Sequence, residues 1–494
     1  MNDNKRAGEL IRFLQPIILV LSFVLVLSAA MTIPSGLLAL GESRREVEAF
    51  LVTGAACLLL AFLGFALTGR RRRFQVTSKQ LYLITVSNWC AFAVAGALPL
   101  YFGLPGLSFA DAFFESMSGI TTTGSTVLTG LDHMAHSILL WRGILQWVGG
   151  IGIIMLGIAI LPFLQVGGMR LFATESSDWS GKSLPRAQTL IRNIGVVYIT
   201  ISLLAAICYH LAGMGAFDAV VHAMTTVSTG GYSNYDASIG YFGDKPGILW
   251  IGSLFMLLGS LPFGLYVAAM YGKRDQLWHD SQVRGFLAFV AVVVLLLSTE
   301  RVLHSDVSFM QALTQATFNV ISVITTTGYV SEDYTLWGPY AIVVFFYLIF
   351  VGGCSGSTAG GLKFFRLQLA VVLLRNQLRL MRHPHAVYTT RYNNRQVTDD
   401  IVRSLIAFSF YFGFTIAVLT FCLSLTGLNF LTSLSAAATA VANVGPGLGD
   451  VVGPSGNFSS LTDTAKWLLA GGMLLGRLEI MTILVMFTRT FWKT

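Results

Sequence analysis

Charged residues are scarce in this chain of 494 residues. Asp, Glu, Lys and Arg together make up 11% of it, whereas soluble globular proteins carry about 25%. Hydrophobic residues account for 54%, and the mean hydropathy is +0.69. This composition excludes an ordinary soluble protein and indicates a chain that crosses a membrane several times.

The chain also lacks the residue patterns of most cofactor and metal sites. Its five cysteines, an odd number, lie in apolar segments without CxxC or zinc-like spacing, which excludes a disulfide framework. Only Cys354 differs, because Gly and Ser surround it. The eight histidines are scattered, and there is no HExxH motif and no phosphate-binding loop. We therefore expect no enzyme and no cofactor held by this chain, so that any control by nucleotide comes from a partner.

Long apolar stretches dominate the sequence. A helix that spans a bilayer needs about 20 residues, and ten stretches reach that length, near 13–33, 49–69, 79–102, 137–164, 190–213, 247–271, 283–303, 338–361, 401–426 and 464–488. Four shorter apolar pieces lie between them, near 109–120, 217–227, 309–324 and 430–442. Pieces of this length suit re-entrant helices shielded by protein or water. The sequence predicts an all-α polytopic membrane protein with ten transmembrane helices.

Basic residues collect in alternate segments between these stretches. With both termini in the cytosol, most of the Lys and Arg residues fall on the inner side, as the positive-inside rule requires. The same rule accounts for the pI near 9.3, so we expect no nucleic-acid partner. The apolar run from Phe13 to Leu40 is too long for the core of a signal peptide and indicates an uncleaved first span.

The loops on the two sides have different charge. Acidic residues outnumber basic ones outside; they either attract cations to that face or simply collect where basic residues are excluded. Inside, the segments Asp178–Lys182 and 375–400 are expected to be cytosolic loops. They are candidate docking surfaces for a partner, or plain solvated loops.

Each short apolar piece runs into a turn that ends in glycine. The four glycine turns are Thr121–Gly124, Val227–Gly230, Thr325–Gly328 and Ala442–Gly445. Each stands between two spans, so the order span, short helix, glycine turn, span occurs four times, as in channel and transporter folds built from repeats. The predicted division is an N-terminal two-helix domain (1–73) and four repeats, at 74–189, 190–280, 281–400 and 401–494.

One Thr-Thr-Thr-Gly is most simply a helix C-cap, but four in register favour a ring of backbone carbonyls. A potassium ion that enters a membrane exchanges its water shell for oxygens, which carbonyls supply without a fixed charge. Glycine reaches φ > 0, so that successive carbonyls can align, and the C-terminal ends of the short helices favour a cation. The predicted potassium-binding residues are Thr122, Thr123, Gly124, Ser228, Thr229, Gly230, Thr326, Thr327, Gly328, Asn443, Val444 and Gly445.

These segments resemble a known family. The motifs are Thr-Thr-Thr-Gly-Ser (121–125), Ser-Thr-Gly-Gly-Tyr-Ser (228–233), Thr-Thr-Thr-Gly-Tyr (325–329) and Asn-Val-Gly-Pro-Gly (443–447). Together with the fourfold plan they resemble the Trk/Ktr/HKT superfamily of potassium transporters. The two extra N-terminal spans and the length resemble its bacterial TrkH-type membrane subunit.

The resemblance implies a pore on a pseudo-fourfold axis within one subunit, in the bacterial inner membrane. It also implies a homodimer and a cytosolic TrkA-type ring that binds nucleotides and gates the pore. Glycine at all four turn positions implies selectivity for potassium over sodium, although the fourth turn departs from the Thr-rich pattern.

The predicted span at 338–361 ends in a run rich in glycine. The run consists of Gly352, Gly353, Cys354, Ser355, Gly356, Ser357, Thr358, Ala359, Gly360 and Gly361. Each glycine costs a helix about 1 kcal/mol relative to Ala. Tight helix packing through small residues is the alternative, but the run holds more glycine than packing needs. We expect a flexible intramembrane loop that meets the cytosol at Lys363, and the resemblance implies that it is the gate beneath the filter.

Arg477 lies inside the last predicted span, where a charge is costly and usually functional. Glu479, two residues on, falls on a different helix face, so we expect no pair between them. Arg477 either bridges to a carboxylate of another repeat or, as the resemblance implies, faces the pore as an electrostatic barrier that contacts the gating loop. The alternative to a gated potassium pore is a potassium symporter coupled to sodium or protons, with Glu479 as its candidate proton relay.

Overall fold

The computed structural model describes residues 2–68, 76–159, 184–385, 390–393 and 395–493. The predicted docking segment Asp178–Lys182 lies outside these residues. Within them, seven helices are long and apolar enough to cross a membrane. They are α1 (Asn2–Ala39) from Phe13 on, α2 (Arg44–Thr68), α3 (Ser78–Gly103), α5 (His136–Ala159), α9 (Leu184–Leu211), α14 (Ser281–His304) and α18 (Asp399–Ser424).

Two further spans are broken. Helix α11 (Pro246–Ser260) and helix α12 (Phe263–Met270) meet at 88°, and α20 (Asp463–Arg477) meets α21 (Ile480–Leu484) at 108°. If each bent pair counts as one span, the described residues hold up to nine candidate spans, not the predicted ten.

The apolar stretch at 338–361 is helical only in its first half, and the glycine run is non-helical, as the sequence predicts. Helix α16 (Pro339–Ile349) has 11 residues, too few to cross a bilayer. The chain is non-helical from there until α17 (Phe364–Arg382) begins. The glycine run is the reason, because Gly356 and Gly361 have φ of 74° and 66°, outside the α-helical region.

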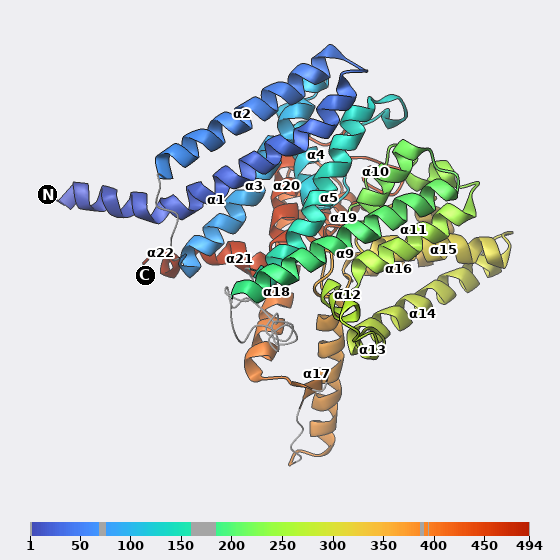
Figure 1. Cartoon of the computed structure of the whole chain (residues 1–494). Coiled ribbons are helices and arrows are strands. Elements are labelled where there is room, and N and C mark those ends of the chain that lie inside the picture. Colours follow the sequence, from blue (N-terminus) through green and yellow to red (C-terminus); the bar gives the residue numbers. More distant parts are fainter. Residues whose placement is uncertain (1, 69–75, 160–183, 386–389, 394, 494) are drawn as a thin grey trace.

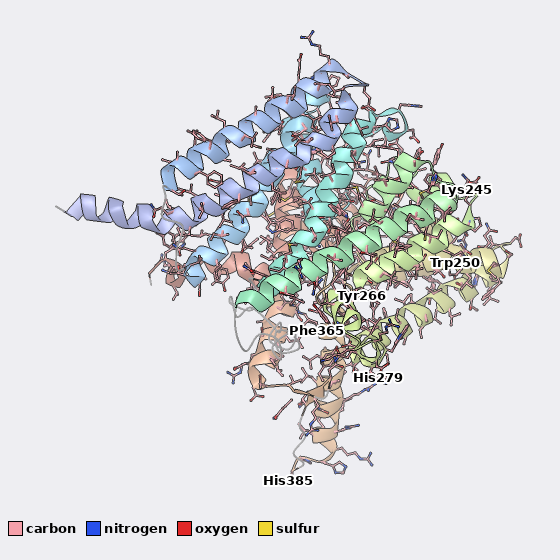
Figure 2. The ribbon with its side chains drawn as sticks, viewed as in Figure 1. Lys245, Trp250, Tyr266, His279, Phe365 and His385 are labelled. Atoms are coloured by element: carbon pink, nitrogen blue, oxygen red, sulfur yellow. The ribbon has the colours of Figure 1, made fainter. Side chains whose placement is uncertain are left out.

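The predicted loop at 375–400 is also partly helical. Helix α17 continues to Arg382, and the strands β1 (Arg391–Tyr392) and β2 (Arg395–Gln396) then pair antiparallel. Helix α17 extends away from the rest of the molecule (Figure 1), with His385 at its far end (Figure 2). The remaining short elements are η1 (Leu131–His133), η2 (Ser238–Phe242), α13 (Asp275–His279), η3 (Tyr334–Trp337), η4 (Val485–Phe487) and α22 (Arg489–Lys493).

The four short helices that the sequence predicts are present. They are α4 (Phe109–Ile120), α10 (Ala216–Val227), α15 (Phe309–Ile324) and α19 (Phe430–Ala442). Three of them begin at a polar residue, Ser108, Ser308 or Asn429, whose side chain accepts a backbone N–H of the first turn. Such caps satisfy donors that would otherwise be unpaired at a helix start.

The packing of these short helices follows a closed cyclic order. Each packs against the helices that precede and follow it in the sequence and against one helix from elsewhere. The extra neighbour is α20 for α4, α5 for α10, α11 for α15 and α16 for α19. The pair α1 and α2, drawn in blue, lies side by side on one flank and outside this ring (Figure 1).

A buried ion pair joins two neighbouring members of the ring. Arg142 on α5 donates through Nε to Glu115 on α4 at 2.8 Å, and their side chains are 2% and 0% exposed. Glu115 also accepts from the hydroxyl of Thr126 at 3.0 Å, and Arg142 donates to the carbonyl of Ser233 at 2.9 Å. The Arg142 guanidinium lies 4.1 Å from the centre of the Tyr232 ring. This network fixes the segments that follow the first two glycine turns.

Removing one partner of this pair should destabilise the protein strongly. Arg142→Met leaves the buried Glu115 charge without its cation, which typically costs about 3–5 kcal/mol. The free energy of unfolding can be measured by denaturant titration of the purified protein in detergent micelles.

Arg44→Met is the matched control, because Arg44 and Glu48 form a pair whose side chains are 92% and 60% exposed. Exposed pairs contribute about 0–1 kcal/mol. A loss for Arg142→Met no larger than for Arg44→Met would show that the buried pair is not what ties the two helices together.

Candidate functional site

The four short helices end in the same unusual backbone conformation. Four residues other than glycine have positive φ there: Thr122 at 52°, Thr229 at 51°, Thr326 at 58° and Asn443 at 54°. Two residues after each comes a glycine with positive φ: Gly124 at 86°, Gly231 at 78°, Gly328 at 81° and Gly445 at 106°. The left-handed region is uncommon for β-branched residues, so four occurrences at one structural position indicate a backbone held by its surroundings.

The second turn has a different register from the one that the sequence predicts. In every turn the residue before the glycine donates its N–H to the carbonyl five residues back. The pairs are Thr123 to Ser118, Gly230 to Thr225, Thr327 to Ser322 and Val444 to Thr439. Gly230 therefore occupies the position of Thr123, and Gly231 is the counterpart of Gly124. Two consecutive glycines made the choice ambiguous in the sequence.

The four glycines meet the backbone of the next turn at close range. A Cβ atom on Gly445 would lie 2.8 Å from the carbonyl oxygen of Thr123. A Cβ on Gly124, Gly231 or Gly328 would collide outright with the carbonyl oxygen of Gly230, Thr327 or Val444, respectively. One carbonyl from each turn thus lies against the glycine of the turn before it in a closed cycle, and we call these four the carbonyl ring (Thr123, Gly230, Thr327 and Val444). No side chain fits between ring members.

Hydrogen bonds tie each turn to its neighbours. Ser125 donates to the carbonyl of Gly445 at 2.9 Å, and the Tyr232 hydroxyl donates to the carbonyl of Glu115 at 2.7 Å. Gln146 on α5 donates to the carbonyl of Gly230 at 2.6 Å and accepts from the N–H of Tyr232 at 3.0 Å. These hydrogen bonds connect the segment of the first turn with the second and the fourth turns.

Several residues that connect the turns could not be predicted from the sequence. Tyr329 reaches from the third turn to the Thr225 hydroxyl on α10 at 2.5 Å, but its role depends on a neighbouring repeat. The same is true of Gln146 and Tyr232. Ser118, Thr225, Ser322 and Thr439 do share a signal, a hydroxyl six residues before each glycine, once Gly231 sets the register.

The glycine loop, residues 350–363, follows α16 and lies against the break between α11 and α12. Its two ends meet at a bridge between Val351 and Leu362. The N–H groups of Cys354 and Thr358 donate to the carbonyls of Ser260 and Gly259 at 2.9 and 3.2 Å. All the residues of the loop from 351 to 360 are buried except Gly356.

The glycine loop also contacts three of the four turns. Gly360 donates its N–H to the Thr326 hydroxyl at 2.6 Å, and the Thr229 hydroxyl donates to that of Thr358 at 3.1 Å. A Cβ atom on Gly360 would lie 2.7 Å from the carbonyl oxygen of Ala442. The loop therefore packs directly against the turns that carry the carbonyl ring, and Gly360 has to be glycine for this approach.

Arg477 ends α20 and is 3% exposed. Its Nη1 donates to the carbonyl of Thr358 at 2.9 Å and its Nη2 to that of Gly149 at 3.4 Å. Its partners in the described part of the chain are thus carbonyls, and no carboxylate pairs with it there. A guanidinium stands beside the glycine loop, next to the carbonyl ring.

Glu479 follows the break after α20 and has φ of 59°. It accepts from Arg366 on α17 at 2.7 Å, and the Arg366 side chain is 2% exposed. The prediction that Arg477 and Glu479 do not pair is therefore confirmed. The Arg366 guanidinium also lies 3.7 Å from the centre of the Phe408 ring. The partner Arg366 was not predicted, because its proximity depends on the loop that precedes α17.

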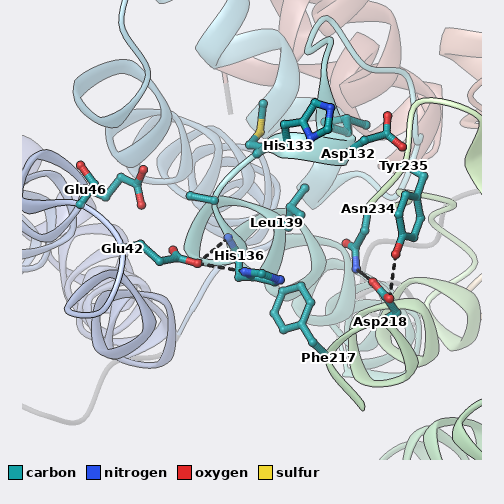
Figure 3. Close-up of a pocket in the computed structure, with 14 residues that line it drawn as sticks. Glu42, Glu46, Asp132, His133, His136, Leu139, Phe217, Asp218, Asn234 and Tyr235 are labelled. Atoms are coloured by element: carbon teal, nitrogen blue, oxygen red, sulfur yellow. Dashed lines mark hydrogen bonds and ion pairs between the residues drawn. The ribbon is translucent and has the colours of Figure 1, made fainter. Parts of the chain in front are cut away.

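A pocket of about 530 Å³ lies at the surface between the α1–α2 turn, η1 and the start of α10 (Figure 3). Glu42, Glu46, Asp132 and Asp218 line it. Glu42 accepts backbone N–H groups from the first turn of α5, at 2.8 Å from His136. Burial alone would raise the pKa of Glu42, but hydrogen bonds from Ser137 and His136 outweigh it and lower the pKa. No group of three or more His, Cys, Asp or Glu residues that could hold a metal ion occurs among the described residues.

Comparisons with known proteins agree over nearly the whole chain. The family described as "TrkH: Cation transport protein" matches residues 48–493. The chain is 52% identical to the Trk system potassium uptake protein TrkI of Halomonas elongata over the full length of both. It is 36% identical to the Trk system potassium uptake protein TrkH of Escherichia coli (strain K12), over 95% of this chain and 97% of that protein.

A solved structure matches as well. The crystal structure of the potassium transporter TrkH from Vibrio parahaemolyticus superposes with a TM-score of 0.89 at 33% identity. The match covers 97% of this chain and 99% of that one. The chain therefore belongs to the TrkH family of cation transport proteins.

Proposed function

We propose that this chain is the membrane pore subunit of a potassium uptake system, with the carbonyl ring as its selectivity filter. The observation that carries the proposal is the meeting of four glycines with four carbonyl oxygens at one axis. The names of the relatives, which are potassium uptake proteins, support the same cargo. The four span, short helix, glycine turn, span units would be repeats around that axis.

Potassium would bind the oxygens of the four turns in place of its water shell. Backbone carbonyls provide dipoles without a net charge, so an ion can enter and also leave. The C-terminal ends of four helices point at this place, and their partial negative charge favours a cation. The filter residues are those predicted from the sequence, with Gly231 added as the counterpart of Gly124, Gly328 and Gly445.

The glycine loop would act as the gate. It lies against the turns at one end of the ring, and its Gly360 backbone comes too close to Ala442 for an ion to pass between them. Arg477 adds a positive charge at the same level, which repels a cation that has passed the ring. Moving the loop aside would open the pathway.

Control would come from a cytosolic partner of the TrkA type that binds nucleotides, because we find no phosphate-binding loop in the sequence. Helix α17 is the candidate lever, because it starts directly after the glycine loop and extends away from the body (Figure 1). Basic residues along it, such as Arg375, Arg379 and Arg382, suit an acidic surface. We further propose a homodimer in the bacterial inner membrane with both termini in the cytosol.

The candidate proton relay of the symporter alternative is part of an ion pair. Glu479 accepts from Arg366 at 2.7 Å, so it joins α17 to the last span. This structural role of Glu479 favours the channel proposal.

Current through a channel should follow the potassium gradient alone. In a planar bilayer, the reversal potential should track the potassium equilibrium potential and stay unchanged when sodium or pH differs between the two sides. A steady shift of the reversal potential with the sodium or proton gradient would instead establish coupled transport.

The register of the second turn can be tested with two neighbouring glycines. Gly231→Ala puts a Cβ atom against the carbonyl of Thr327 at a φ of 78°, so it should abolish selective flux. Gly230→Ala meets the end of the Gln146 side chain and not backbone. Gln146 would have to give up its hydrogen bonds to Gly230 and Tyr232, so this variant should reduce flux several-fold but retain more of the preference for potassium than Gly231→Ala. Potassium and sodium flux into proteoliposomes measures both variants.

Equal effects of Gly231→Ala and Gly230→Ala would contradict this register. Gly124→Ser provides a reference in the first turn, where the register is not in doubt. It should lower the preference for potassium over sodium, and an unchanged preference would refute the assignment of the ring as filter.

Removing the charge of Arg477 should raise flux in the absence of a partner. Arg477→Gln keeps a hydrogen-bond donor for the Thr358 carbonyl but removes the positive charge. A hydrogen bond from a charged donor is stronger than one from a neutral donor, and the difference in free energy corresponds to about a tenfold change in an equilibrium constant. We expect an increase in potassium flux of about that size. Arg375→Gln is the control, because Arg375 is exposed on α17, and it should leave this flux unchanged. A flux of Arg477→Gln at or below that of the control would exclude a barrier role.

A further inference from the structure

The surface pocket between the α1–α2 turn, η1 and the start of α10 has no part in the proposed pore (Figure 3). Four carboxylates from three separate parts of the chain line it: Glu42, Glu46, Asp132 and Asp218. Glu46 is 9% exposed, so its charge is largely removed from water and needs another partner. The pocket therefore gathers negative charge where bulk water alone does not solvate it.

The chain provides little positive charge to balance these carboxylates. Among the described residues, no Lys or Arg pairs with any of the four, and His136 contacts Glu42 at 3.1 Å. Other partly buried acids do have a cation of their own. Asp111, for example, pairs with Lys466 at 2.6 Å. The pocket thus differs from those sites in leaving its acids open to a cation from outside the chain.

Asn234 gives an independent sign of a ligand. It lines the pocket and is 3% exposed. Its Nδ2 donates to Asp218 at 2.8 Å, which fixes the amide, because the opposite orientation would set its oxygen against a carboxylate. That oxygen, Oδ1, has no hydrogen-bond partner in the described part of the chain. Figure 3 shows it directed away from Asp218 and into the pocket, on the side of Leu139. A buried acceptor without a donor is costly, so the ligand should carry donors.

Two of the carboxylates have acceptor positions to spare. In the described part of the chain, Glu46 accepts from the Ser137 hydroxyl at 2.5 Å, and Asp132 accepts a backbone N–H of Asp236 at 3.4 Å. An ionised carboxylate offers about four acceptor positions. Both groups can therefore accept further N–H donors without breaking the contacts that they already make.

The pocket has acidic ends and an apolar middle. Glu42 and Glu46 lie on one side and Asp218 on the other, with Leu139 and Phe217 between them (Figure 3). A compact metal ion does not match, because the described residues contain no group of three or more His, Cys, Asp or Glu that could hold one. An aliphatic chain with an ammonium group at each end does match. Each ammonium brings a positive charge and three N–H donors, and the methylene groups cover the apolar side chains.

We propose that this pocket binds an aliphatic diamine. One ammonium group binds at Glu42 and Glu46, and the other binds at Asp132, Asp218 and Asn234. The volume of about 530 Å³ lies in the range of small-molecule sites. A diamine in this place would tie the N-terminal helix pair to the segment after the second glycine turn. The inference does not rest on the carbonyl ring being a potassium filter.

Binding can be measured as thermal stabilisation, because a ligand that binds only the folded protein raises the melting temperature. The probe is cadaverine, added to the full-length protein in detergent micelles. The potassium concentration is held constant, so that occupancy of the carbonyl ring does not change. We expect a saturable rise in melting temperature. Pentylamine has the same carbon chain but a single ammonium group, so it should need roughly tenfold more for the same rise.

Charge-neutral variants test each end of the pocket. Glu46→Gln and Asp132→Asn should each weaken cadaverine binding about tenfold, the equivalent of one charge-assisted hydrogen bond. Asp244→Asn is the matched control, because Asp244 is an exposed carboxylate that does not line the pocket, and its affinity should equal that of the parent. Asp132 is exposed as well, so Asp132→Asn keeps the test valid if Glu46→Gln does not fold.

Three outcomes would overturn the diamine site. One is the absence of any rise in melting temperature with cadaverine. Another is an equal rise with pentylamine, or with magnesium at the same ionic strength, which would show general screening of an acidic surface. The third is an affinity of Asp132→Asn equal to that of Asp244→Asn, which would place the bound cadaverine elsewhere on the protein.

Discussion

The structure depends on one close approach, in which each of four glycines lies against a carbonyl oxygen of the next turn. A contact of this kind leaves no room for a Cβ atom at Gly124, Gly231, Gly328 or Gly445, and it requires positive φ at each of them. The short helices must then end at the same depth and point at one axis. Their cyclic packing against the longer helices follows from that requirement.

The four turns share one backbone geometry, but different side chains hold each of them in place. Nine residues before the four glycines stand Glu115, His222, Asn319 and Ala436. The first three each hold the segment after their own turn, through Thr126, Ser233 and Ser331 respectively. Ala436 cannot do so, and the fourth turn relies on Ser435, which donates to the Leu448 carbonyl at 3.1 Å. The same backbone geometry can thus be supported by different side chains, because a buried polar group needs a hydrogen-bond partner but not a particular one.

The sequence predicted the parts of the fold that depend on local chemistry. Short apolar runs located all four short helices, and the glycines marked their ends. It missed what depends on distant contacts. The register at Gly230 and Gly231 is decided by a collision with another turn. The pair Glu115–Arg142 lies within one predicted repeat, but the sequence does not show that these two side chains meet. The pair Glu479–Arg366 joins two different predicted repeats.

The segment at 338–361 shows which part of a loop the sequence can predict. Its glycine run predicted a non-helical stretch, but not the partners of its backbone groups, and a segment at membrane depth can be non-helical only when those groups find partners elsewhere. Those partners are the carbonyls of Ser260 and Gly259 and the N–H of Phe263, all at the break of the α11–α12 span. They belong to a different predicted repeat and cannot be read from the segment itself.

The same pairing constrains how the pathway can open. Helix α11 ends with four carbonyls that have no helical partner. Ser260 and Tyr266 side chains satisfy those of Leu257 and Leu258, whereas the glycine loop satisfies the last two. When the loop moves, these two carbonyls lose their donors at membrane depth, and water has to replace them. In the proposed gating movement, the open pathway would therefore be hydrated below the carbonyl ring. Dehydration of the ion would then be confined to the ring itself, where backbone oxygens would replace the lost water.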